Sequence, residues 1–574
     1  AQAAQHMRHF RRVGIVRLAL LVIEAVLIWW TIKGLSVWWL LPPAALFFAL
    51  AKVQSRITKL RRSCERAVAL YEQGLARLDD RWAGTGATGQ RFLNGEHPYA
   101  EDLDLFGHGS LFELLSTART HVGEETLAHW LLGPASAEVV RARQEAVAEL
   151  RPNLDLREDL ALMGEEVPSE ETARGLAAWA ESQPWSITRN TRAIASTLGV
   201  LALVTLIPGF AGFGWSPFLL SALMGQLYAY TLRTKVQRVI NGVDGPGRNL
   251  ELLSHVLSRI ERERFSSSRL VELQRALDVA GSPPSAQIAR LNRLIELLDS
   301  RRNLMFAPFA TVLLWPLQCS ISIERWRQQS GPAVARWLAA VGEFEALNSL
   351  ASYSYEHPQD PFPELIPDSQ FQSCALGHPL IPDDRNVRTD LRLSEDLRVL
   401  IVSGSNMSGK STLLRTVGVN TILALAGAPV RARSLSLSPL QVGASIRIQD
   451  SLQAGASRFY AEITRLRQIV QLTEGPLPVV FLLDEILHGT NSHDRHIVAE
   501  SVIRGLVDRG AIGLVTTHDL VLARIADTLA TRAANVHFED HLENGRMTFD
   551  YLLRPGVVQR SNALELMRSV GLEI

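Results

Sequence analysis

The chain has 574 residues, with 59 lysines and arginines against 59 aspartates and glutamates, so its formal net charge is zero. This length leaves room for several domains, and the neutral balance excludes a chain whose whole surface is basic, although a local basic patch is compatible with it. The three cysteines, Cys64, Cys319 and Cys374, form no CxxC or Cys/His cluster. That pattern argues against structural zinc and favours a reducing, cytosolic environment for the soluble part.

Two apolar runs, 15–32 and 36–53, come first in the chain. A membrane span needs roughly 20 mostly apolar residues, and each run is close to that length. Arginines and lysines flank the pair on both outer sides, whereas Lys33 is the one basic residue between the runs. This asymmetry predicts a transmembrane hairpin with both ends on the cytoplasmic side. Four tryptophans lie at its tip, where interfacial aromatics belong: Trp29, Trp30, Trp38 and Trp39.

A second apolar pair, 194–213 and 217–232, repeats the pattern with basic residues outside it. We interpret it as another transmembrane hairpin, because two such pairs are poorly explained by a signal peptide. Burial of both pairs as core helices of a soluble protein is the alternative. A third apolar stretch, 304–323, is interrupted by Pro308 and Pro316, and we expect a core or interfacial helix there.

The segments 54–188 and 233–300 carry leucines every three or four residues among many charges. This spacing predicts long amphipathic helices whose leucine stripes are packing seams. The Pro/Asp-rich piece 357–367 is typical of a linker and precedes the last domain.

A glycine-rich loop follows the apolar run 399–402 and precedes a helical pattern over 412–425. Residues 404–411 read Gly-Ser-Asn-Met-Ser-Gly-Lys-Ser, a complete phosphate-loop motif in the strand–loop–helix setting that it requires. Backbone N–H groups of such a loop close around phosphate oxygens, and the helix directs its positive end at them. We predict that Lys410 contacts the β- and γ-phosphates of a nucleoside triphosphate and that Ser411 offers its hydroxyl to Mg²⁺.

A second apolar strand begins at Val479 and ends in two acids, Asp484 and Glu485. Asp484 is predicted to hold the water shell of the metal, and Glu485 to polarise the attacking water. In isolation the two acids would be ordinary strand-end carboxylates. Following a phosphate loop by about seventy residues, they predict nucleotide hydrolysis.

The residues of this last domain resemble the MutS family of ABC-type ATPases. The segment 403–412 is similar to that family's phosphate loop, with Ser408 where glycine is usual. Segment 377–381 is similar to the family's lead-in strand near the base, and segment 457–462 to its signature. Segment 483–492 is similar to its Asp-Glu and D-loop run, and segment 515–518 to the segment with its switch histidine. The signature departs from the pattern at Gln449 and Arg458, and the D-loop run departs at Leu487 and His488.

The resemblance implies a homodimer that holds ATP and Mg²⁺ in composite sites, with the phosphate loop of one subunit facing the signature of the other. It implies that Glu485 and His518 are catalytic, and that Ser411 and Asp484 hold the metal. Ser457 would act on the nucleotide of the partner subunit. The nucleotide-binding residues that it implies are Gly404, Ser405, Asn406, Met407, Ser408, Gly409, Lys410, Ser411, Thr412, His378 and Ser457.

A weaker similarity to the family's helical core and lever covers residues 100–150, and the resemblance resumes at residue 250 and continues through the ATPase part to residue 574. Nothing before it resembles the family's mismatch-reading or connector domain, and the second apolar pair stands where some members insert a DNA clamp. No added helix-turn-helix is expected at the carboxy-terminal end. We therefore expect a membrane-anchored branch that keeps the motor and the lever.

The expected fold is an α/β P-loop ATPase domain after an all-α lever that carries two transmembrane hairpins. The expected location is the cell membrane, with several passes and a cytoplasmic ATPase domain. The predicted divisions are the first hairpin, first core part, second hairpin, second core part and ATPase domain: 1–60, 61–190, 191–235, 236–360 and 361–574.

Three functions follow from these features. The first is a DNA-associated ATPase of the mismatch-repair or damage-sensing kind, and the second is a membrane ATPase that remodels a protein partner or the bilayer without DNA. Neutral net charge favours the second, while basic helices at 259–264 and 290–293 keep the first open. An ABC transporter half is disfavoured, because the chain has no Leu-Ser-Gly-Gly-Gln signature and four short helices make a thin translocation path.

Overall fold

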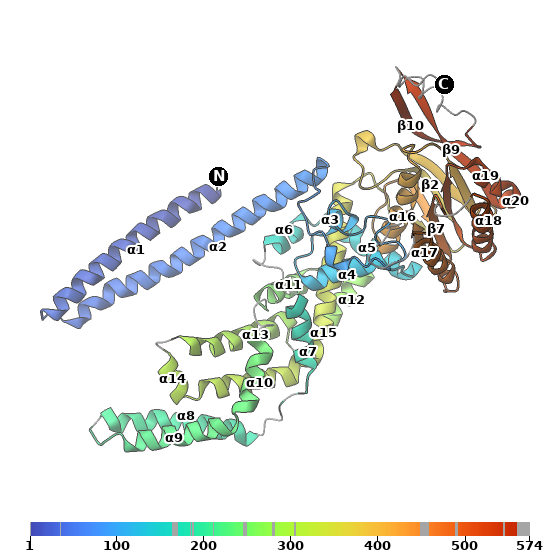
Figure 1. The fold of residues 1–574 in the computed structure, drawn as a ribbon. Coiled ribbons are helices and arrows are strands. Elements are labelled where there is room, and N and C mark those ends of the chain that lie inside the picture. The colour runs from blue at the N-terminus through green and yellow to red at the C-terminus, as the bar shows by residue number, and fades with distance from the viewer. Residues whose placement is uncertain are drawn as a thin grey trace. The chain divides into compact units, whose positions relative to one another are not determined.

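The computed structural model describes residues 2–34, 36–162, 170–183, 185, 189–210, 212–244, 250–277, 282–303, 306–447, 458–487, 492–543 and 546–558. The chain forms two compact units (Figure 1). Unit 1 comprises Ala1–Asp79 and Leu154–Glu165, and unit 2 comprises Asp80–Asn153 and Glu166–Ile574.

Unit 1 is a helical hairpin of α1 (Gln2–Ile32) and α2 (Leu41–Leu78), with α6 (Leu154–Leu162) packed on α2. A short 3₁₀ turn, η1 (Val37–Leu40), precedes α2, whose first turn carries the proline pair that is tolerated at a helix start. Between the helices, the Arg17 guanidinium lies 4.4 Å from the centre of the Phe47 ring and donates a hydrogen bond to Gln54.

Two helices in the described part of the chain are long and apolar enough to cross a membrane. They cover Val13–Thr31, of which 6% is buried, and Asn190–Gly209, of which 17% is buried. The second helix of each predicted hairpin is not a candidate span. These helices are α2 and the 16-residue α9 (Ser216–Thr231). Two complete transmembrane hairpins are therefore not established, although both helical pairs form.

The helical part of unit 2 is built around α15 (Trp315–Glu356), a helix of 42 residues. Trp326, Trp337 and Phe344 are almost fully buried along it. The predicted amphipathic helices pack on α15 and on one another. They are α3 (Leu111–Leu115), α4 (His121–Leu132), α5 (Ala137–Leu150), α7 (Glu170–Glu181), α10 (Arg233–Asp244), α11 (Leu250–Arg262), α12 (Ser268–Leu277) and α13 (Pro284–Asp299). The first helix of the second apolar pair, α8 (Arg189–Phe210), also packs on α15.

The third apolar stretch is not one helix, contrary to our expectation. A short helix, α14 (Ala307–Val312), ends before Leu314, which has φ 52°, and α15 begins at Trp315. A residue in the left-handed region cannot continue a helix, and Pro316 suits the first turn of the next one. Leu314, Leu317 and Ile321 then pack with Ala195 of α8, so the start of α15 rests on the second apolar hairpin.

The last domain holds two sheets (Figure 1). The smaller has the strand order β1-β5-β2-β3, and the larger has the order β10-β9-β4-β8-β7-β6. The strands are β1 (Glu364–Leu365), β2 (Phe371–Leu376), β3 (Thr389–Leu393), β4 (Val399–Ser403), β5 (Ser434–Leu437), β6 (Gln441–Ser445), β7 (Val479–Asp484), β8 (Ile512–Thr517), β9 (Ala533–Glu543) and β10 (Arg546–Pro555).

In the larger sheet, every strand pair except β9–β10 is parallel. Strands β4, β7 and β8 are almost wholly buried, as expected for parallel strands covered on both faces. The helices of this domain are α16 (Lys410–Ala426), α17 (Arg458–Leu472), α18 (Ser492–Asp508), α19 (Leu520–Ala523) and α20 (Ile525–Thr528). The carboxyl ends of β4, β7 and β8 meet at one edge, which is where ligands bind in α/β sheets.

Candidate functional site

The phosphate loop, residues 404–409, joins the end of β4 to the start of α16, as predicted. Gly409 has φ 98° at the N-cap of α16, a conformation that side-chain-bearing residues rarely adopt. The Lys410 ammonium donates to the carbonyl oxygens of Gly404 and Ser405 at 2.9 and 2.8 Å. The phosphate loop therefore folds around the side chain of Lys410, the first residue of α16.

Two hydroxyl groups in the phosphate loop suit an anionic ligand. The side-chain oxygens of Ser405 and Ser408 are buried and have no hydrogen-bond partner within the described structure. Buried polar atoms are nearly always paired, so these two groups point to a missing acceptor. Together with the N–H groups at the start of α16, they fit the oxygens of a bound phosphate.

The two predicted metal ligands, Ser411 at the start of α16 and Asp484 at the end of β7, lie side by side. The Ser411 hydroxyl donates to Asp484 Oδ2 at 2.5 Å, and the Thr516 hydroxyl donates to Asp484 Oδ1. Hydroxyl and carboxylate oxygens are the hard ligands that Mg²⁺ prefers, and it usually takes its other ligands from water and substrate phosphates.

The two predicted catalytic residues also face each other. Glu485 Oε1 lies 3.3 Å from His518 Nδ1 and 3.6 Å from the Lys410 ammonium. Burial lowers the pKa of Lys410, while the negative charges of Glu485 and Asp484 act in the opposite direction. A polyanion bound at the loop would therefore stabilise the charged form of Lys410, which burial disfavours.

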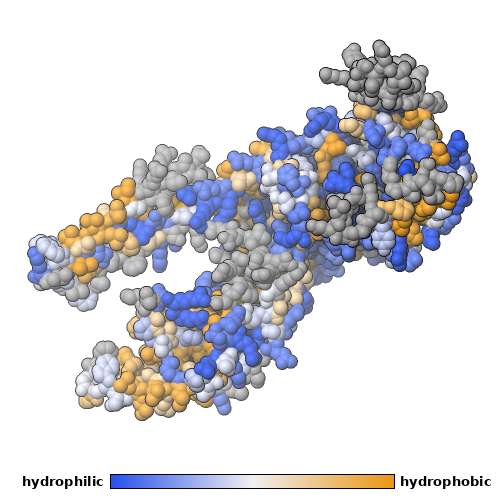
Figure 2. Space-filling view, viewed as in Figure 1, coloured by the Kyte–Doolittle hydropathy of each residue, from blue (hydrophilic) through white to orange (hydrophobic). Residues whose placement is uncertain are grey.

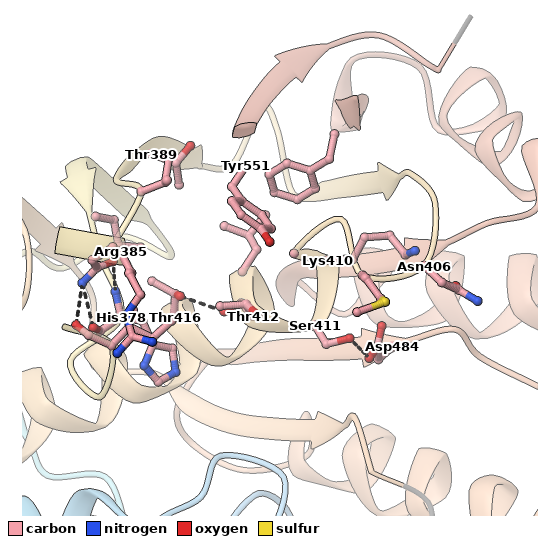
Figure 3. A pocket seen from close by; sticks show the side chains of 18 of the residues that line it. His378, Arg385, Thr389, Asn406, Lys410, Ser411, Thr412, Thr416, Asp484 and Tyr551 are labelled. Atoms are coloured by element: carbon pink, nitrogen blue, oxygen red, sulfur yellow. Dashed lines mark hydrogen bonds between the residues drawn. The ribbon is translucent and has the colours of Figure 1, made fainter. Parts of the chain in front are cut away.

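Lys410, Ser411, Asp484 and Glu485 line one end of a pocket of about 900 Å³ (Figure 3), whereas the predicted catalytic residue His518 is not among its lining residues. The other end is formed by Leu376 and the base-side loop, residues 377–388, between β2 and β3. Ligand sites in proteins are commonly ~300–1,000 Å³, so the pocket has room for a nucleotide. The pocket-lining residues at this end are Leu376, His378, Ile381, Asp384, Arg385, Asn386 and Val387, followed by Thr389 of β3.

His378 lines the pocket as predicted, but it is not on a strand. Strand β2 ends at Leu376, and the Asn386 side chain donates to the carbonyl oxygens of His378 and Ile381, which holds the segment as a loop. The N–H of Leu380 donates to His378 Nδ1 at 3.1 Å, which places the imidazole proton on Nε2. Burial lowers the pKa of His378 to about 4, so the side chain is neutral near pH 7.

Three side chains at the site were not predicted from the sequence. Phe538 of β9 and Tyr551 of β10 line the pocket, and Figure 3 shows Tyr551 between Thr389 and Lys410. Thr516 contacts both acids. No predicted motif includes Phe538 or Tyr551, and Thr516 lies in the segment 515–518, where only His518 was predicted to act; the strand order and register bring these side chains to the site.

The predicted partner-facing residue, Ser457, lies outside the described residues, as do 448–456 and 488–491. The acid that follows the signature, Glu462, is described. It is buried in α17 and accepts a hydrogen bond from the N–H of Leu487, so it supports the loop that follows Glu485.

Residues 400–573 match the family model for MutS domain V. Endonuclease MutS2 of Thermus thermophilus is 36% identical over 205 residues, covering 35% of this chain and 26% of the relative. DNA mismatch repair protein MutS 2 of Halobacterium salinarum is 33% identical over 243 residues (42% and 27%). DNA mismatch repair protein MutS of Roseiflexus sp. is 29% identical over 247 residues (42% and 22%).

The matched region spans about a quarter of the length of these relatives. The family model covers the phosphate loop and the two acids, whereas the pocket-lining residues 376–389 precede it. MutS domain V belongs to a family of ATPases, in agreement with that geometry. The carboxy-terminal part of the chain is therefore similar to domain V of the MutS family.

Proposed function

We propose that the chain binds ATP with Mg²⁺ in this pocket and hydrolyses it. The observation that carries the proposal is the convergence of Lys410, Ser411, Asp484 and Glu485 at one end of a nucleotide-sized pocket, with His518 beside Glu485. These residues come from the start of α16, the end of β7 and the loops after β7 and β8, a span of more than 100 residues. Their convergence is what phosphoryl transfer needs, because catalysis there is mainly positioning and charge stabilisation.

In this proposal the phosphate loop binds the triphosphate through its N–H groups and through the hydroxyls of Ser405 and Ser408. Lys410 turns from Glu485 toward the β- and γ-phosphates, which releases the Glu485 carboxylate to orient the attacking water. His518 supports that carboxylate through the 3.3 Å contact. Mg²⁺, held through Ser411 and Asp484, would neutralise phosphate charge.

The test compares Lys410→Ala with Glu485→Gln in the purified full chain. Lys410→Ala is expected to lose nucleotide binding, because the phosphates lose their cation. Glu485→Gln is expected to bind ATP normally and to lose turnover, because an amide cannot polarise water as a carboxylate does. Wild-type turnover in both variants, measured as phosphate release, would refute the assignment.

We further propose that two copies close over the nucleotide. Two apolar side chains of this domain are exposed: Met407 in the phosphate loop is 85% exposed, and Tyr460 at the start of α17 is 66% exposed. Burying such side chains against a second copy would be favourable. This arrangement would place the segment before α17 at the partner's nucleotide, as the MutS resemblance implies.

Helix α15 is the element that would transmit the closure of the two copies from the nucleotide pocket to the helical part of the chain. At 1.5 Å per residue its 42 residues span about 63 Å. The start of α15, near Trp315, packs on the α8–α9 hairpin, and the chain after its last residue, Glu356, leads to Asp360. Asp360 lies 3.2 Å from the Arg431 guanidinium, which also contacts Asp383 of the base-side loop at 2.5 Å. These three residues, called the Arg431 clasp below, support coupling between the nucleotide pocket and the hairpin.

The bilayer is the proposed environment of the apolar helices. Their apolar side chains face outward: Leu203, Leu219 and Leu223 are 43%, 62% and 65% exposed, and Figure 2 shows hydrophobic colour along the α8–α9 hairpin. Such a contiguous apolar surface needs a cover. In a carbonate wash of membranes from expressing cells, the full chain should stay in the pellet. Release into the soluble fraction would contradict membrane insertion.

DNA binding is the second candidate, because the relatives bear names of mismatch-repair proteins. Gel shifts of the detergent-solubilised chain over a salt series separate the two roles. Steep loss of binding with salt would support contacts to DNA phosphates. The absence of binding at low salt would favour an ATPase that acts on a protein partner or on the bilayer.

A further inference from the structure

Thr516 lies on β8 directly opposite Asp484 in the parallel register of β7 and β8. It is fully buried. Its hydroxyl donates to Asp484 Oδ1 and accepts from the N–H of Glu485 at 3.1 Å. A hydroxyl has one proton, so a group that donates to the carboxylate is left to accept from the amide. The Thr516 side chain thus contacts both neighbouring acids, as a donor to Asp484 and as an acceptor from Glu485.

The backbone of Glu485 needs such support. Its φ of 47° lies in the left-handed region, which residues with side chains enter at an energetic cost and which is often found at functional sites. The N–H of Glu485 donates to the carbonyl oxygen of Thr516 at 3.2 Å as well as to its hydroxyl. This turn directs the Glu485 carboxylate to His518.

We infer that Thr516 is a positioning residue for both acids, an inference that rests on the proposed ATPase function. With Oδ1 of Asp484 held by Thr516, the other oxygen, Oδ2, faces Ser411, where the metal would bind. With its amide held, Glu485 keeps the backbone turn that presents its carboxylate to the pocket. Groups that orient metal ligands typically change metal affinity or activity by ~10–100-fold when removed.

The experiment uses the purified full chain with Thr516→Val, Thr516→Ser and the matched control Thr421→Val. Thr421 is also a fully buried threonine of this domain, but its hydroxyl donates to the carbonyl oxygen of Val417 within α16. The first measurement is the Mg²⁺ concentration that half-saturates binding of a fluorescent, non-hydrolysable ATP analogue. The second is kcat for ATP hydrolysis.

Thr516→Val should raise the half-saturating Mg²⁺ concentration and lower kcat, each by about tenfold or more. Thr516→Ser retains the hydroxyl and should restore both values to near wild type. Thr421→Val should leave both unchanged. Thr516→Val with wild-type Mg²⁺ dependence and kcat would overturn the inference, and so would equal losses in Thr421→Val.

Thr516→Ala serves the same comparison if the valine variant does not fold, because it removes the hydroxyl without a branched side chain. Wild-type values in a folded Thr516→Ala would overturn the inference. Failure of the proposed function is distinguishable, because the wild-type chain itself would then neither bind the analogue nor hydrolyse ATP. If the inference alone fails, the wild-type chain binds the analogue and hydrolyses ATP, and Thr516→Val and Thr516→Ala do so with wild-type values.

Discussion

At the scale of single residues, His378 shows how burial sets the chemistry of the pocket. Its imidazole is 7% exposed and accepts from the N–H of Leu380 through Nδ1, so it offers the pocket a neutral Nε2–H group. Charging this side chain would require a proton in a buried place and would oppose that hydrogen bond. Burial therefore lowers its pKa from 6.5 to about 4.

This pKa predicts acid destabilisation. Between pH 6.5 and 4 the unfolded chain binds a proton at this histidine that the folded chain does not, so the free energy of unfolding falls as pH falls, by at most about 3 kcal/mol. His378→Asn keeps an acceptor for Leu380 but has no charge to gain. Urea titrations at pH 6.5 and pH 4 should show a smaller loss in the variant. Equal losses would contradict the assigned burial.

At the scale of elements, the Arg431 clasp holds the end of the long helix to the base-side loop. The Asp360 side chain is 1% exposed, and Arg431 is its facing cation. Removing one partner of a buried ion pair typically costs ~3–5 kcal/mol, because the other charge stays buried. Arg431→Met should therefore lower the free energy of unfolding by that order in urea titrations.

A matched control is available in the same loop. Arg388 also contacts Asp383, at 3.2 Å, but both side chains of that pair are partly exposed. Exposed pairs contribute ~1 kcal/mol or less, so Arg388→Met should have a small effect. Adding Asp360→Asn to Arg431→Met should recover part of the loss, since no buried charge then remains. A loss for Arg431→Met no larger than that for Arg388→Met would show that the clasp does not stabilise the fold.

The sequence predicted the elements whose residues interact locally. Strand β4, helix α16 and strand β7 follow from an apolar run, a complete phosphate-loop motif and a second apolar run that ends in two acids. Helix α5 (Ala137–Leu150) lies in the segment 54–188, for which amphipathic helices were predicted. In each case the pattern and the element lie in the same stretch of chain, so no distant contact decides the outcome.

Elements decided by distant contacts were missed. Thr516 meets Asp484 only because β8 pairs with β7 in one register, and a shift of one residue would turn it to the other face. Tyr551 reaches the pocket from β10, in the last part of the described chain. The break at Leu314 was also missed, because hydrophobicity continues across it and a left-handed leucine has no sequence signal.

At the scale of the whole molecule, the proposal joins a MutS-type ATPase domain to apolar helical hairpins. Within unit 2 the Arg431 clasp joins the base-side loop to the segment that follows α15, and the start of α15 packs on the α8–α9 hairpin. The domain divisions at 60, 190, 235 and 360 stay predictions. Helix α2 runs without interruption past residue 60, so the first hairpin and the charged segment after it share one helix.

The central claim is that ATP closes two copies of this domain through a site in which Glu485 acts on water. The most direct measurement is the mass of the solubilised full chain carrying Glu485→Gln, determined by light scattering with and without ATP and Mg²⁺, beside the variant that also carries Lys410→Ala. We predict a dimer that forms with ATP in the single variant and is lost in the double variant. A mass that does not respond to ATP in the single variant, although the nucleotide is bound, would contradict the account.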